Sequence, residues 1–123
     1  KLFSAKMDLS WLTGDRLAAY KREWSRPNRL RGMVNWYRAS PLRVAKPGVP
    51  LTDLPDLPHD KLMVNCPHLL IWGTRDTALL PQSYAGLDHF APDLTIKQID
   101  TADHWVCHQQ PDEVAKAIRE WHP

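Results

Sequence analysis

A chain of 123 residues with 43% hydrophobic residues and a formal net charge of +2 is typical of a globular protein of about one domain. This composition excludes a disordered segment, and we expect neither a signal peptide nor a membrane-spanning helix, because the apolar runs are too short. Two cysteines, Cys66 and Cys107, are too few for a disulfide framework and lack the paired spacing of a zinc site. We therefore expect both to be reduced, buried side chains of a cytoplasmic protein.

The positive charges are concentrated in the first part of the chain. Residues 1–46 contain 11 Lys and Arg against 3 Asp and Glu, whereas residues 47–123 contain 5 against 11. A basic segment that also contains Trp24, Trp36 and Tyr37 suits binding to nucleic acid or to an acidic partner. The arginines are scattered and come without a nucleic-acid motif, so we interpret the segment as solvated helical faces with buried aromatic residues.

Two helices are predicted within residues 1–40. Thr13 is suited to cap a helix from about Gly14 to Trp24, and "RPN" at 26–28 ends it. A second helical pattern covers "RLRGMVNWYRAS", residues 29–40, in which one stripe contains Leu30, Met33, Val34 and Tyr37. Two short helices joined by a tight break are more typical of a lid or a helical hairpin than of a self-sufficient core.

Residues 41–60 are predicted to be a long connection without regular structure. The segment contains the prolines Pro41, Pro47, Pro50, Pro55 and Pro58. Proline lacks the backbone N–H that helices and sheets use, so this density prevents a regular element.

The remaining residues alternate between strands and helices. The apolar run "HLLIWG" (68–73) predicts a strand buried on both faces, and "LTIKQID" (94–100) predicts a second strand. Helices are predicted at "LPQSYAGLDHFAP" (80–92) and, started by a proline, at "PDEVAKAIREW" (111–121). The crossover is long enough to make the strands parallel. Two strands and two helices cannot cover both faces of a parallel sheet, so we expect an α/β portion of a larger sheet protein.

Two polar side chains are predicted at the same edge of this sheet. Asp76 follows the first strand and His104 follows the second, and functional residues gather at the carboxyl ends of parallel strands. An Asp that accepts the Nδ1 proton of a His leaves Nε2 free as a general base. The alternatives are a turn-forming Asp and a structural His. Asp103 is a rival acid, but adjacent residues seldom point at one another.

The segments "CPHLLIWGTRDTALLPQSYAGL" and "DLTIKQIDTADHWVCHQQPDEVAKAIREW" resemble the C-terminal end of the α/β-hydrolase fold, in the branch of epoxide hydrolases and haloalkane-type dehalogenases. "RLRGMVNWYRAS" is similar to the last cap-domain helix of that branch. The resemblance extends from about Leu9 to Trp121. It implies the end of a helical cap at 1–40, a return connection at 41–60, and the C-terminal part of the hydrolase core at 61–123.

This resemblance implies roles for five residues. His104 matches the base that activates water, and Asp76 matches the acid that orients it. Tyr37 matches a cap tyrosine that donates a hydrogen bond to the epoxide oxygen, and Trp36 and Trp105 are expected beside the pocket. The family needs no metal and no cofactor. It commonly has Gly near the position two before the histidine, where this chain reads "TAD".

The nucleophile of the fold, in a Gly-x-nucleophile-x-Gly run, has no match among the five scattered glycines of this sequence. The expected partner is therefore an N-terminal half that carries the nucleophile, and the chain alone is expected to be inactive. The expected substrate is a small epoxide; nucleic acid and membranes are not expected partners, and a homodimer stays open. Alternatives are a dehalogenase, an esterase with a Ser nucleophile, or a non-catalytic fragment that binds an acidic partner through its basic half.

Overall fold

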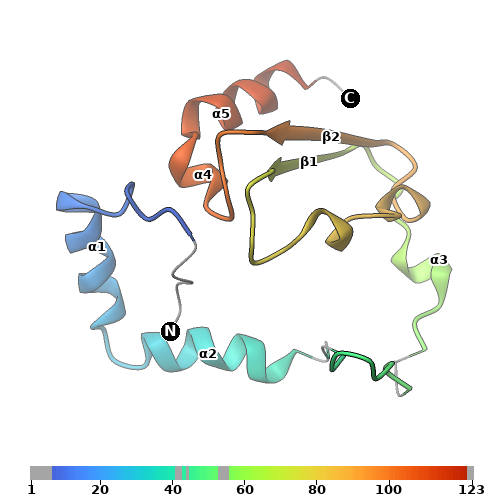
Figure 1. The fold of residues 1–123 in the computed structure, drawn as a ribbon, viewed down its shortest axis with the longest axis horizontal. Helices are drawn as coiled ribbons and strands as arrows, with labels where there is room; N and C mark the ends of the chain where they lie inside the picture. The colour runs from blue at the N-terminus through green and yellow to red at the C-terminus, as the bar shows by residue number, and fades with distance from the viewer. Residues whose placement is uncertain (1–6, 41–42, 44, 53–55, 122–123) are drawn as a thin grey trace. The chain divides into compact units, whose positions relative to one another are not determined.

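The computed structural model describes residues 7–40, 43, 45–52 and 56–121. The chain forms two compact units, one of Lys1–Trp11 with Leu57–Pro123 and the other of Leu12–Asp56 (Figure 1). The first unit contains the strands and the C-terminal helices, and the second is helical.

The helical unit contains α1 (Gly14–Trp24) and α2 (Arg29–Ala39), which confirms both predicted helices. The turn between them passes through Asn28, whose φ of 62° is left-handed. Thr13 occupies the N-cap position, but its side chain makes no capping hydrogen bond to the described residues. Within α1 the rings of Tyr20 and Trp24 meet edge to face, with centroids 5.3 Å apart.

The expectation of buried aromatic residues in the basic segment is wrong for α2. The side chains of Trp36 and Tyr37 are 77% and 74% exposed, and Leu30, Met33 and Val34 are also exposed. Two helices contact each other along one stripe only, so the apolar residues beyond that stripe stay uncovered within this unit.

The other unit is built on two parallel strands, β1 (His68–Gly73) and β2 (Leu94–Ile99), as predicted. Their register runs from His68 opposite Leu94 to Gly73 opposite Ile99. Figure 1 shows that both arrows point the same way, so the carboxyl ends of the strands lie at one edge of the sheet.

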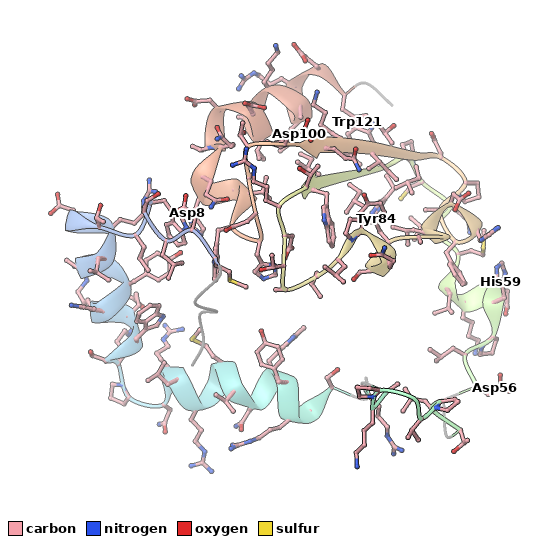
Figure 2. All side chains as sticks on the ribbon, viewed as in Figure 1. Asp8, Asp56, His59, Tyr84, Asp100 and Trp121 are labelled. Atoms are coloured by element: carbon pink, nitrogen blue, oxygen red, sulfur yellow. The ribbon has the colours of Figure 1, made fainter. Side chains whose placement is uncertain are left out.

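The crossover between the strands differs from the single helix predicted at 80–92. It contains two short 3-10 turns, η1 (Pro81–Ser83) and η2 (Leu87–His89). Gly86 separates them with a left-handed φ of 80°, which interrupts any continuous helix. Tyr84, labelled in Figure 2, attaches this segment to the sheet: the centroid of its ring lies 4.9 Å from that of Trp72, and its hydroxyl accepts a hydrogen bond from Gln98 Nε2 at 2.9 Å.

After β2 the chain forms a short helix, α4 (Val106–Gln109), and then α5 (Pro111–Glu120), the predicted C-terminal helix with proline in its first turn. The single-turn helix α3 (His59–Leu62) begins inside the segment predicted to lack regular structure, so that prediction is wrong at its end. The helix starts directly after Pro58, where proline stands outside the turn and blocks no hydrogen bond. Pro41 and Pro55 lie outside the described residues.

The core of this unit is small. Among the described residues, the buried apolar side chains are Ala91, Ile99, Ala102 and Ala117. β1 is only half-buried apart from Gly73, and β2 is largely exposed. The expectation of a strand buried on both faces is therefore not met within the described part of this chain, where residues 68–72 of β1 are only half-buried.

The prediction that both cysteines are buried is also wrong: Cys66 and Cys107 are free and exposed. Cys66 lies before β1, and Cys107 lies in α4. In the parts of the chain that the structure describes, none of the helices combines the length and the apolar character that crossing a bilayer requires.

Candidate active site

The ends of β1 and β2 are joined by a tight backbone contact at Gly73. A Cβ atom added to Gly73 would overlap the carbonyl oxygens of Asp103 and Ala102, so the position accepts only glycine at this spacing. Beyond it, the N–H of Thr74 donates to Ile99 O at 3.1 Å, and the N–H of Arg75 donates to Ala102 O at 3.0 Å. The two loops that leave the strands are thereby held together.

Asp76 lies in the first of these loops, buried, and uses both carboxylate oxygens. Oδ1 accepts the backbone N–H groups of Ala78 and Leu79 at 2.8 and 2.9 Å. Oδ2 lies 2.9 Å from Nδ1 of His104, 28 residues further along the chain. One oxygen of Asp76 therefore makes the contacts of a turn-forming Asp and the other contacts His104, while the catalytic roles of both residues stay predictions.

The electrostatics of Asp76 favour its ionised form. Burial acts to raise the pKa of this carboxyl, but the hydrogen bonds from Leu79 N–H, His104 and Ala78 N–H outweigh it, so the pKa lies below its ordinary value. An ionised carboxylate accepts hydrogen bonds and cannot donate them. In a neutral His104 the proton must therefore be on Nδ1, and Nε2 carries the lone pair.

His104 is partly accessible, with 33% of its side chain exposed. Its ring contacts Trp105 edge to face, with centroids 5.4 Å apart. The ring also lines a shallow hollow of about 150 Å³ at the end of the strands, together with Ile71, Trp72, Gly73, Asp76, Leu79, Asp103 and Val106. A base with a free lone pair at the wall of such a hollow is suited to take a proton from water.

The other predicted site residues have different surroundings. Trp105 follows His104 and packs against the ring of Trp11 at 5.5 Å. Trp36 and Tyr37 lie on α2, in the other compact unit, with most of their side-chain area exposed. The roles of all three residues stay predictions.

The sequence did not indicate the surroundings of Asp103. Its buried carboxylate does not face His104; Oδ1 accepts the N–H of Trp105 at 3.0 Å, and Oδ2 accepts the N–H of Asp8 at 2.7 Å. Gln109 completes this cluster. Among the described residues, no group of three or more His, Cys, Asp or Glu side chains is placed to hold a metal ion.

Comparison with known proteins extends these observations. No family model matches the chain. AB hydrolase superfamily protein YfhM of Bacillus subtilis (strain 168) is 29% identical over 109 residues, which are 89% of this chain and 34% of that protein. Epoxide hydrolase srdG of Neurospora crassa is 31% identical over 103 residues, which are 83% of this chain and 28% of that protein. The chain thus spans about a third of the length of these relatives.

Solved structures agree in fold. A crystal structure of a mutant epoxide hydrolase from Bacillus megaterium matches with a TM-score of 0.68 at 23% identity, over 89% of this chain and 37% of that chain. The structure of the Bacillus megaterium enzyme in complex with an inhibitor matches over the same shares, with a TM-score of 0.66 at 23% identity. In sequence the chain is related to two α/β-hydrolase-superfamily proteins, one of them an epoxide hydrolase, and its fold is the C-terminal part of an α/β-hydrolase fold.

Proposed function

We propose that the complete protein containing this chain converts epoxides to vicinal diols through a covalent ester intermediate. The observation that carries the proposal is the contact of 2.9 Å between Asp76 Oδ2 and His104 Nδ1, which leaves Nε2 as a base beside the hollow at the strand ends. The relationship to an epoxide hydrolase supports the choice of substrate.

The first step needs a nucleophile that this sequence lacks. We infer an aspartate from the N-terminal portion of the fold, on the same polypeptide or on a partner chain. Its carboxylate attacks an epoxide carbon, a C–O ester bond forms, and the ring C–O bond breaks. Tyr37 and a second tyrosine outside this chain hydrogen-bond to the ring oxygen, and a phenol with a pKa of about 10 can give its proton to the far more basic alkoxide.

The second step uses the pair described above. His104 Nε2 takes a proton from water while the water oxygen attacks the ester carbonyl carbon. Asp76 holds the ring through Nδ1 and stabilises the imidazolium that forms. When the acyl C–O bond breaks, the diol leaves and the aspartate is regenerated. The proton held by His104 then returns to the tyrosine phenolate, so no net proton is gained or lost.

The remaining aromatic residues are assigned to substrate binding. Trp105 lies next to the base, and its ring meets the His104 ring edge-on. Trp36 precedes Tyr37 on α2, and both residues are exposed. Both indoles are large apolar rings, which suits a small, mainly apolar epoxide.

The test compares products from two substrate classes. The complete protein is incubated with an aryl epoxide and, separately, with a haloalkane, and diol and free halide are measured. We expect diol formation without halide release. Halide release as the main activity would favour a dehalogenase that uses the same Asp–His pair. Neither product, together with hydrolysis of a carboxylic ester, would show an esterase.

A further inference from the structure

The loop that carries His104 is fastened by a closed ring of hydrogen bonds to the segment around Asp8. Asp103 Oδ2 accepts the backbone N–H of Asp8 at 2.7 Å. Gln109 Nε2 donates to the backbone oxygen of Asp8 at 3.2 Å, and Gln109 Oε1 accepts the N–H of Asp103 at 2.8 Å. The backbone N–H and C=O of Asp8 are thus both bound, by the side chains of Asp103 and Gln109, which stand before and after His104 in the chain.

The same two side chains fix the backbone on both sides of His104. The N–H before it, that of Asp103, is bound by Gln109, and the N–H after it, that of Trp105, is bound by Asp103 Oδ1 at 3.0 Å. Asp103 is 7% exposed, so its carboxylate makes these bonds largely away from water, where a charged acceptor forms strong hydrogen bonds.

Aromatic contacts extend the attachment by a few residues. The ring of Trp11 stacks on His108 in α4, with centroids 4.2 Å apart and an interplanar angle of 5°. It also meets Trp105 at 5.5 Å. Asp8 itself is turned by its own side chain, whose Oδ1 accepts the N–H of Ser10 at 2.8 Å. Residues 8–11 therefore lie against the histidine loop and α4 within one compact unit.

We propose that Asp103 and Gln109 are positioning residues of His104, which hold its loop against residues 8–11 and so fix the direction of Nε2. The consequence for catalysis rests on the proposed function, whereas the consequence for the imidazole does not. A displacement of about 1 Å at a reacting group lowers a rate by about 100-fold. Loosening this ring therefore slows the step in which His104 acts, and it leaves the nucleophilic step unchanged.

The experiment uses three variants of the complete protein. Asp103→Asn replaces one acceptor oxygen by an NH₂ group, so that the N–H of Asp8 or of Trp105 loses its acceptor. Gln109→Met keeps the length of the side chain and removes both of its hydrogen bonds. Asp100→Asn is the matched control, since Asp100 is an exposed carboxylate directly after β2, three residues before Asp103 (Figure 2).

We expect Asp103→Asn and Gln109→Met to slow hydrolysis of the ester by about 10- to 100-fold, with formation of the ester within about twofold of the parent. In ¹⁵N spectra the downfield Nδ1–H signal of His104 should broaden or shift in both variants and stay unchanged in Asp100→Asn. Equal slowing of both chemical steps would indicate general structural damage and overturn the proposal. So would an unchanged Nδ1–H signal with full ester hydrolysis in both variants.

The spectroscopic measurement separates this proposal from the proposed function. If the parent protein hydrolyses no epoxide but the His104 signal responds to both variants, the positioning role stands and the epoxide assignment fails. If Asp103→Asn does not fold, Gln109→Met still tests the ring, because it leaves the buried carboxylate and its bonds to Asp8 and Trp105 in place.

Discussion

Replacement of Asp76 by Asn separates the two interactions of this side chain. In the parent, Oδ1 accepts the N–H groups of Ala78 and Leu79, and Oδ2 lies 2.9 Å from His104 Nδ1. An Asn oxygen in the place of Oδ1 keeps both backbone bonds, but its NH₂ group then donates toward Nδ1. Nδ1 has to carry the lone pair, the proton moves to Nε2, and the site loses its base.

The expected magnitude follows from this change of tautomer. The corresponding Asp-to-Asn change in a serine-protease triad lowers kcat by about 10⁴-fold. For Asp76→Asn we expect ester hydrolysis to fall by about 10³- to 10⁴-fold, which corresponds to about 4 to 5 kcal/mol of transition-state stabilisation. Asp76→Asn should destabilise the fold less than Asp76→Ala does, because the N–H groups of Ala78 and Leu79 keep an acceptor. Asp76→Ala removes that acceptor and should cost about 1 to 3 kcal/mol of folding free energy for each N–H that stays buried.

The assay is a rapid-quench measurement on the complete protein with an epoxide in excess. Intact mass spectrometry follows the covalent ester, and chromatography follows the diol. Asp76→Asn should form the ester at the parent rate and accumulate it. An Asn variant that turns over at the parent rate would refute the orienting role of Asp76, and so would a variant that fails to form the ester although it is folded.

Three further variants and one pH dependence complete the predictions. His104→Ala should form the ester once and then stop; repeated turnover of that variant would contradict its role as the base. Tyr37→Phe should slow ring opening more than ester hydrolysis, and an unchanged opening rate in rapid-quench experiments would leave Tyr37 a packing residue. Gly73→Ala should lower the thermal midpoint, with a cost of about 1 to 3 kcal/mol, because the new Cβ meets the Ala102 carbonyl oxygen at 2.7 Å; an unchanged midpoint would refute the close contact. Because the pKa of Asp76 is lowered in the folded state, its carboxylate adds stability above about pH 4, and this stability is lost as the pH falls through the folded-state pKa. The free energies of unfolding in urea of the parent and of Asp76→Asn should therefore converge at low pH. A difference between these free energies that does not change with pH would contradict this.

The sequence predicted the elements whose signals are local. The strand at 68–73 follows from a continuous apolar run, and the helix that starts at Pro111 follows from helical spacing; a short window of residues contains each signal in full. The prediction of one crossover helix at 80–92 was wrong, because the spacing of apolar residues does not reveal that Gly86 adopts a left-handed φ. The buried aromatic stripe on α2 was wrong because burial depends on what covers the helix, and a helical pattern does not state this.

The candidate site also contains contacts that the sequence could predict and contacts that it could not. The approach of Asp76 to His104 could be predicted, since parallel strands bring their carboxyl ends to one edge and each residue lies in the loop that follows a strand. The ring around Asp103 could not be predicted. Its bonds join Asp8 to Asp103, which lies 95 positions further along the chain, and to Gln109, which lies 101 positions further. Neither Asp8 nor Gln109 stands in a recognisable motif.

The pairing of β1 with β2 has a consequence for handling the protein. In the described part of the chain each strand has one neighbour, so the outer side of each presents a row of backbone donors and acceptors to solvent. Unpaired edges of this kind template strand addition from other molecules. Material prepared from these residues alone should self-associate as its concentration rises, and co-expression with the complementary portion of the fold is the remedy that the topology suggests.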